Sequence, residues 1–315
     1  MTQGLSISSC WNSSRHESGY AMLEELAGLG FSAVELSHGI RISLVEGILE
    51  AVRDGVVSIS SVHNFCPLPA GITYAAPNLF QPSARNKTER ALWLRHTLGT
   101  LRFARDVGAK RVVIHSGSAW FFLGEPDQPM EQFMAQYEGD FAGLADEKRF
   151  QRLRDKAMKK VRRKQKRALP RVMEAYREVL EPLKDFDLQL GIENREGFLE
   201  LPMDDSMADF LQDLGEPERY GCWLDTGHAW LKKSYGLTDP VPYLETIGER
   251  LVGWHLHDVS AEGRDHQVPG TGLVDFPALR RFLRPQQTVV LELSPKLSSD
   301  DIRRSRDFAM EWMQG

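Results

Sequence analysis

Eight short apolar runs alternate with longer helical patterns along the chain, and this alternation constrains the fold more than any other feature. Each run is nearly continuous in apolar residues, which is typical of parallel strands buried on both faces. The runs cover residues 5–10, 33–37, 56–63, 111–116, 188–193, 220–225, 251–257 and 288–293. Eight successive βα units predict an α/β protein with a closed (β/α)8 TIM barrel. An open doubly wound sheet is disfavoured, because no G-x-G-x-x-G turn follows the first run.

A chain of 315 residues suits one barrel domain over residues 1–315, since α/β barrels of this size are routinely single domains. Two segments break the regular spacing. Residues 64–86 form a loop rich in Pro, Asn and aromatic side chains, which we expect to cover the mouth of the barrel. Residues 117–170 form an extended helical insert after the fourth strand.

Part of this insert, residues 148–171, is crowded with Lys and Arg. We interpret it as a solvated helix with Leu153, Met158 and Val161 along a narrow inner side. The chain as a whole has a net charge of −5, which gives no general attraction to polyanions. This net charge disfavours nucleic acid as a partner without excluding binding at a local basic patch, and the oligomeric state stays open.

The chain carries no signal for secretion or membrane insertion. The first residues have neither a basic leader nor an apolar core, and no apolar run approaches the length of a bilayer. Cys10, Cys66 and Cys222 form no disulfide framework, so we expect reduced thiols. These features predict a cytoplasmic protein without a membrane partner.

Acidic and histidine side chains gather at the C-terminal ends of the predicted strands, where barrel enzymes place their reactive groups. In chain order they are Glu35, His38, His63, His115, Glu193, Asp225, His228, His255, His257, His266 and Glu292. Seven of the nine histidines fall at such positions, which indicates one shared site. Alternate residues of a strand share a face, so His255 and His257 are predicted to point the same way.

Glu193, Asp225, His255 and Glu292 form the strongest subset, because they follow four consecutive strands. Three carboxylates and one imidazole suit Mn²⁺ or Zn²⁺, with Mg²⁺ and Co²⁺ as further options. Three buried carboxylates without a cation would repel one another and take up protons. The sequence therefore predicts a divalent-metal site.

Several phrases of the chain resemble the xylose isomerase-like TIM-barrel superfamily, which includes ketose 3-epimerases, inosose dehydratase-type enzymes and the endonuclease IV group. They are HSGS after strand four, IEN at strand five, LDTGHA at strand six, HLHD followed by DHQVPGTGLVDF after strand seven, and LELSP at strand eight. The resemblance covers nearly the whole chain apart from the 117–170 insert. It implies a barrel with a metal centre at its mouth.

In the sugar isomerase and epimerase branch, the resemblance places a single metal on Glu193, Asp225, His255 and Glu292. It also implies that Glu193 and Glu292 act as acid and base on opposite faces of a carbohydrate substrate. His228 falls on a substrate-binding position, and Arg264 loosely matches a substrate-binding arginine.

In the endonuclease IV branch, which cleaves DNA phosphodiesters with three zinc ions, additional ligands would fall on His63, His115, His228 and His266. That branch needs an Asp two residues before His266. This chain has Arg264 there, with Asp265 one place late, which favours the sugar branch.

We therefore expect proton transfer at a carbon next to a carbonyl, through an enediolate that a divalent metal stabilises. Epimerisation, isomerisation and dehydration by a lyase all remain open, as do phosphorylation of the substrate and a barrel that only binds. His257 and His266 are predicted to contact substrate or to hold a metal ligand. Aromatic side chains that could line the mouth, or else pack between loops, are Trp11, Phe65, Trp120, Phe121 and Trp230.

Overall fold

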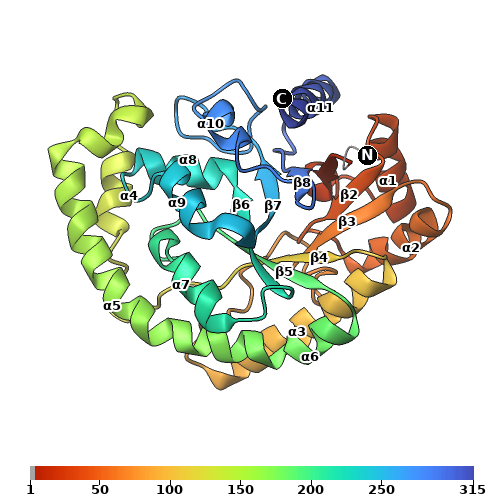
Figure 1. Ribbon diagram of the computed structural model, residues 1–315, viewed down its shortest axis with the longest axis horizontal. Coiled ribbons are helices and arrows are strands. Elements are labelled where there is room, and N and C mark those ends of the chain that lie inside the picture. Colours follow the sequence, from red (N-terminus) through yellow and green to blue (C-terminus); the bar gives the residue numbers. More distant parts are fainter. Residues whose placement is uncertain (1–3) are drawn as a thin grey trace.

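The strands form a closed parallel barrel in chain order, with β8 paired to β1 (Figure 1). The computed structural model describes residues 4–315. The strands are β1 Ser6–Ser8, β2 Ala33–Leu36, β3 Ser58–His63, β4 Arg111–Ile114, β5 Gln189–Glu193, β6 Tyr220–Asp225, β7 Leu251–Leu256 and β8 Thr288–Leu291. The predicted TIM barrel is confirmed.

Helices surround the barrel and follow its strands along the chain. The α-helices are α1 Gly19–Gly28, α2 Val45–Arg53, α3 Lys87–Asp106, α4 Gln128–Met134, α5 Lys148–Glu178, α6 Leu180–Asp185, α7 Asp204–Leu214, α8 Thr226–Ser234, α9 Pro240–Ile247, α10 Phe276–Arg280 and α11 Ser299–Gln314. Short 3-10 turns are η1 Ser9–Trp11, η2 Ile42–Leu44, η3 Phe141–Asp146 and η4 Gly248–Arg250.

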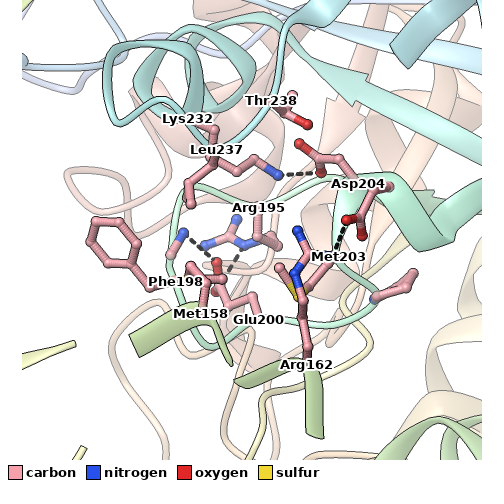
Figure 2. A pocket seen from close by; sticks show the side chains of 13 residues that line it. Met158, Arg162, Arg195, Phe198, Glu200, Met203, Asp204, Lys232, Leu237 and Thr238 are labelled. Atoms are coloured by element: carbon pink, nitrogen blue, oxygen red, sulfur yellow. Dashed lines mark hydrogen bonds and ion pairs between the residues drawn. The ribbon is translucent and has the colours of Figure 1, made fainter. Parts of the chain in front are cut away.

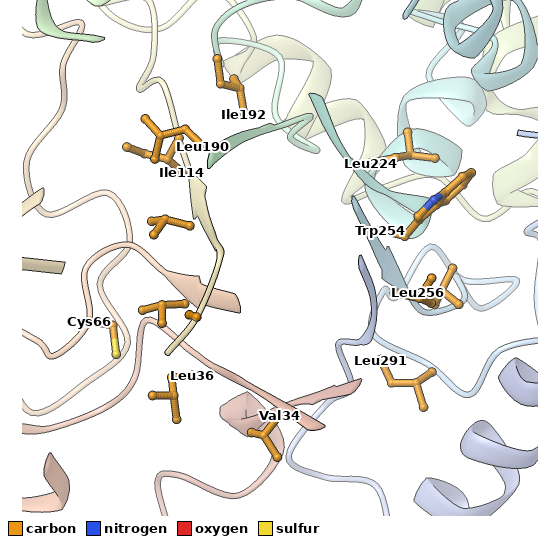
Figure 3. Close-up of a cluster of buried hydrophobic side chains, with 14 of the residues drawn as sticks. Val34, Leu36, Cys66, Ile114, Leu190, Ile192, Leu224, Trp254, Leu256 and Leu291 are labelled. Carbon is orange, nitrogen blue, oxygen red and sulfur yellow. The ribbon is translucent and has the colours of Figure 1, made fainter. Parts of the chain in front are cut away.

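Alternate residues of each strand face two different environments. Figure 3 shows the outward set, in which Leu190 and Ile192 of β5 and Leu224 of β6 point from the strands toward the helices. The residues between them face the barrel interior, because side chains alternate along a strand. This alternation directs Glu193 and Asp225 inward at the ends of their strands.

Trp223 fills the barrel interior next to the polar residues. A Cβ on Gly191 would lie 2.7 Å from the Trp223 ring, and one on Gly253 would overlap it. These two glycines therefore make room for the indole. Its ring meets the His255 ring edge to face with centroids 5.3 Å apart, so the imidazole rests on a packed floor.

The connection from β4 to β5 contains α4, η3, α5 and α6, and α5 is the longest helix of the described part. Figure 1 shows α5 as a green arc along the outer edge of the molecule. It continues past residue 170, with Pro170 inside it, to Glu178. Its inner side packs Phe150, Met158 and Val161 into a second hydrophobic cluster, with Leu153 partly buried beside them.

No helix within residues 4–315 is both long and apolar enough to cross a membrane. Cys10, Cys66 and Cys222 are free thiols. Burial raises the pKa of Cys222 to about 12, although its bond with Tyr243 acts the other way. This thiol is therefore protonated near neutral pH and unreactive.

Candidate metal centre

Four side chains from the last four strands converge at the C-terminal end of the barrel. Glu193 and Asp225 end their strands, His255 lies in β7, and Glu292 directly follows β8. Their ligand atoms all lie within 4.8 Å of one another. The His255 Nδ1 atom is 3.1 Å from Glu193 Oε1, 3.0 Å from Glu292 Oε2 and 3.9 Å from Asp225 Oδ2.

This four-residue cluster has the charge and donor types that a divalent cation requires. Burial raises the pKa of Glu193, but hydrogen bonds with His115, His255 and His63 hold it well below its ordinary value. Burial also raises the pKa of Glu292, and the nearby His255 lowers it well below the usual range. Both carboxylates are therefore charged, and three anionic oxygen ligands with one imidazole nitrogen fit Mn²⁺ or Zn²⁺.

Glu35 orients the histidine of this cluster from the opposite side of the barrel. Its two carboxylate oxygens lie 3.1 and 3.3 Å from His255 Nε2, and Ser61 Oγ donates to Glu35 at 2.7 Å. The His255 Nδ1 atom therefore faces Glu193 and Glu292. Burial lowers the pKa of His255, but Glu292 and Glu35 raise it well above its ordinary value.

Asp225 is held by its neighbours on three sides. Its backbone N–H donates to Asn194 Oδ1 at 2.6 Å, and its Oδ1 accepts the His228 N–H at 2.7 Å, where it caps α8. A carboxylate oxygen of Asp225 also lies 2.9 Å from His257 Nε2. The IEN and LDTGHA phrases of the sequence thus encode one hydrogen-bonded support.

Both nitrogens of His257 are engaged, which determines its role. The backbone N–H of His266 donates to His257 Nδ1 at 2.9 Å, so Nε2 carries the proton that it donates to Asp225. Gly227 lets α8 approach this ring, because a Cβ there would overlap the His257 imidazole. His257 therefore positions Asp225 and has no free nitrogen for a metal.

A second group of potential metal ligands consists of His63, His115 and Glu193. The positively charged side chain of Arg195 lies beside this group. Arg195 Nη1 lies 3.1 Å from His115 Nε2 and 3.7 Å from Glu193 Oε2, and its side chain is only 15% exposed. Burial lowers the pKa of His115 to about 4, and Arg195 contributes to this shift. The guanidinium thus supplies the positive charge that a second metal would bring to this group.

Sequence reasoning did not identify Arg195. The available signal was its position two residues after Glu193, in a loop where barrel enzymes carry functional groups. Glu200 and Glu196 of the same loop bind the other side of the guanidinium, at 3.3 and 2.9 Å. These two acids hold Arg195 toward the barrel axis.

The third group, His228, His257 and His266, lies next to Asp225 and Glu292. The His266 ring stacks on His257 with centroids 4.2 Å apart, and its Nδ1 lies 3.2 Å from Asp265. Burial lowers the pKa of His266, but Asp265 and Glu292 raise it to about 9. In its protonated form His266 can donate hydrogen bonds to the oxygens of a substrate.

Arg264 does not join the other predicted site residues. Its side chain is 74% exposed and lies 3.2 Å from Glu262, and within residues 4–315 it makes no hydrogen bond or ion pair with the four-residue cluster. The adjacent Asp265 turns instead toward His266.

The predicted aromatic residues divide between the interior and the surface. Trp11, Phe65 and Trp230 are buried, and the Trp11 indole donates to the Leu297 carbonyl at 2.9 Å. Trp120 is 48% exposed, with Arg85 above its ring. Lys164 lies over the Phe121 ring.

Two pockets are lined by residues that neighbour the site, although no member of the four-residue cluster lines either of them. The first is rich in hydroxyl groups and includes Ser13, Ser37 and Thr73 beside His38. The His38 ring packs on His63 at a centroid distance of 4.7 Å, and His63 Nε2 is 3.3 Å from Glu193, so two histidines connect this pocket to the four-residue cluster.

Figure 2 shows the second pocket, on the far side of Arg195. Its charged side chains form pairs, Lys232 with Asp204, Arg162 with Asp205, and Arg195 with Glu200. The pocket is therefore nearly neutral and does not attract an anion.

Comparisons with known proteins agree with this architecture. A structure described as a D-tagatose 3-epimerase-like protein has a TM-score of 0.66 and 17% identity, with 99% of this chain and 97% of that chain covered. D-psicose 3-epimerase from Clostridium cellulolyticum H10, bound to D-tagatose, has a TM-score of 0.66 and 12% identity, with 99% of each chain covered. The IOLI protein with a bound zinc atom has a TM-score of 0.64 and 12% identity, with 99% of this chain and 98% of that chain covered.

At these identities the structural likeness shows the fold. A search of curated proteins found no match to this chain. A family profile described as xylose isomerase-like TIM barrel matches residues 23–312, which is nearly the whole chain. The chain belongs to the xylose isomerase-like TIM barrel family.

Proposed function

We propose that the protein is a divalent-metal-dependent sugar isomerase or epimerase that moves a proton at a carbon next to a carbonyl. The observation that carries this proposal is the placement of Glu193 and Glu292, whose oxygens lie 3.1 and 3.0 Å from the same His255 nitrogen. Two carboxylates on either side of one ligand position can reach a bound substrate from two directions. One would remove the proton and the other would return it.

Glu193, Asp225, His255 and Glu292 would hold the metal, with Mn²⁺ or Zn²⁺ as the favoured ions. When bound, the cation would polarise the carbonyl oxygen of the substrate and so acidify the neighbouring C–H bond. The zinc atom in the IOLI protein supports this assignment. The free cysteine thiols support a cytoplasmic location.

The other site residues would orient the substrate. His228 and His266 present imidazole groups beside the metal ligands, and the hydroxyl-rich pocket next to His38 can bind a polyhydroxylated molecule. The carbohydrates in the names of the D-tagatose 3-epimerase-like protein and D-psicose 3-epimerase support a sugar substrate. If removal of the proton were followed by loss of a β-hydroxyl from the substrate, the enzyme would be a lyase.

Arg195 argues against the phosphodiesterase alternative. A trinuclear site needs a second cation between His63, His115 and Glu193, but the guanidinium of Arg195 already lies beside two of them, His115 and Glu193. A third cation would need His228 and His266 with a further carboxylate, while Asp265 is turned to His266 and Arg264 is exposed.

The test combines metal analysis with proton exchange. The purified protein should contain one divalent metal per chain, and ketoses, inososes or 3-keto-sugars incubated with it in D2O should gain deuterium next to the carbonyl. Glu193→Gln and Glu292→Gln should each abolish this exchange. Glu25→Gln is the matched control, since it removes a carboxylate paired with His16 away from the centre. Three zinc ions per chain, or unchanged exchange in both site variants, would contradict the proposal.

A further inference from the structure

The outer surface of α5 carries an unusual concentration of positive charge. Residues 148–171 contain thirteen Lys and Arg and one acid, Asp155, although the chain as a whole has a net charge of −5. All of these residues belong to one continuous helix at the edge of the molecule (Figure 1). The charge is therefore held along one helix.

Nine of the cations share one side of this helix, which we call the basic face of α5. At 3.6 residues per turn they fall within an arc of about 120°, and they extend over about 29 Å of the helix axis. Every one of them is exposed, and they are Lys148, Arg149, Arg152, Lys156, Lys159, Lys160, Arg163, Lys166 and Arg167. The mean spacing is about one cation per 3 Å of axis.

The other four cations of the segment have partners inside the protein. Arg154 pairs with Asp155 and Arg162 with Asp205, Lys164 lies over Phe121, and Arg171 donates to the Ser83 carbonyl. The nine residues of the basic face form no ion pair with any carboxylate in residues 4–315. Arg149 lies over the Phe133 ring, and the charge of the basic face is otherwise directed to solvent.

This arrangement disfavours the isolated helix. Like charges at i and i+4, such as Arg152 with Lys156 or Lys159 with Arg163, repel by about 0.2–0.5 kcal/mol for each pair. The fold does not require these charges, because the opposite side of α5 anchors the helix through Phe150, Val161 and their neighbours. An external polyanion would turn the repulsion into attraction.

We propose that the basic face of α5 binds the phosphate backbone of duplex nucleic acid without reading its sequence. Each strand of a duplex carries one phosphate per about 3.4 Å of axis, close to the spacing of the cations. Between residues 148 and 167 the 120° arc holds only these nine cations, so it offers no aromatic ring on which single-stranded bases could stack and no apolar side chain that could enter a membrane. The acidic remainder of the chain has little effect, since salt screens charges beyond about 8 Å.

This binding is separate from the proposed sugar chemistry. No residue of the basic face forms a hydrogen bond or ion pair with the metal-ligand cluster within residues 4–315. The basic face would hold the enzyme on nucleic acid and cleave nothing. Neither proposal depends on the other.

The test uses a fluorescent 24-base-pair duplex of mixed sequence and measures its anisotropy from 50 to 200 mM salt. Six of the nine cations lie within an arc of about 80°, so about six phosphate contacts are expected. The logarithm of the binding constant should then fall against the logarithm of the salt concentration with a slope of about −5. Binding should then weaken about 10³-fold over this range. A fourfold variant of the basic face combines Lys156→Gln, Lys159→Gln, Arg163→Gln and Lys166→Gln. Its binding to the duplex should weaken only about tenfold between 50 and 200 mM salt, with a slope near −2.

The matched control removes the same charge elsewhere, from exposed residues of α2 and α3: Arg53→Gln, Lys87→Gln, Arg95→Gln and Arg102→Gln. The control should keep the salt slope of the natural protein. Both variants should still exchange the sugar proton next to the carbonyl with solvent. If the fourfold variant of the basic face loses helicity, the single variant Lys159→Gln is tested instead, and it should reduce the magnitude of the salt slope by about 0.9. No duplex binding at 50 mM salt, an equal loss in the control, or tighter binding to single strands or to phosphatidylserine vesicles would overturn the proposal.

Discussion

Glu35→Gln is the most direct test of how the barrel orients His255, a candidate metal ligand. Glu35 and His255 lie on β2 and β7, and both side chains are completely buried. The carboxylate contacts His255 Nε2 and so keeps Nδ1 aimed at the candidate metal position. Glutamine preserves the shape of the side chain and removes its charge, so the variant isolates the electrostatic part of the support.

The expected effect follows from the change in hydrogen-bond type. A buried hydrogen bond to a charged acceptor stabilises by about 1.5–3 kcal/mol, and one between neutral groups by about 0.5–1.5 kcal/mol. The difference of about 1–2 kcal/mol corresponds to a metal dissociation constant raised about 5- to 30-fold. Loss of a group that supports a metal-bound histidine typically weakens binding by about 10- to 100-fold, which agrees in size.

Metal affinity is measured by competition with a chelator, using Zn²⁺ and Mn²⁺ separately. Glu25→Gln is the control, because Glu25 forms the same kind of pair with His16, at 2.6 Å, outside the site. Its affinity for metal should match that of the natural protein. A Glu35→Gln variant that binds both metals as tightly as the control would refute the role given to Glu35.

Three further predictions test other parts of the structure. Gly227→Ala should destabilise the fold by about 1–3 kcal/mol and weaken metal binding, because its Cβ would overlap His257, whereas Gly99→Ala, with nothing near its Cβ, should do neither in denaturant titrations. Arg195→Ala should raise the zinc content from one to two ions per chain, and Arg195→Lys should not; a constant count of one would refute the view that Arg195 replaces a cation. Burial raises the pKa of Asp127 to about 6, so folded Asp127 holds its proton more tightly than the unfolded chain and stability falls as pH rises from about 4 to 6. Asp127→Asn should therefore raise Tm by roughly 2–4 °C at pH 7 and have little effect at pH 4, and an equal gain at both values would contradict this assignment.

The fold was predictable because a parallel barrel leaves a direct record in the sequence. Strands buried on both faces need apolar residues at nearly every position, so eight such runs specify eight strands. The same geometry predicts the site, since all strands end on one rim. Glu193 and His255 could therefore be assigned to one centre although the sequence separates them by 62 residues.

The supporting residues were harder to predict, because their roles depend on side-chain direction. Glu35 was recognised only as one of several acids at strand ends. Its contact with His255 arises from closure of the barrel, which places β2 across the interior from β7. Arg264 was expected to face the substrate, but no buried acid draws it inward and it pairs with Glu262 at the surface.

Arg195 shows why such choices depend on a whole loop. An arginine after a barrel strand can point to solvent or toward the axis, and its own identity does not decide between them. Here Glu196 and Glu200 pair with one side of the guanidinium while Glu193 and His115 lie against the other, so these four groups fix one direction. Loss of any one of these acids would weaken the inward position. In the proposed site, the number of metals would thus depend on Arg195, Glu196 and Glu200, which would bind no metal themselves.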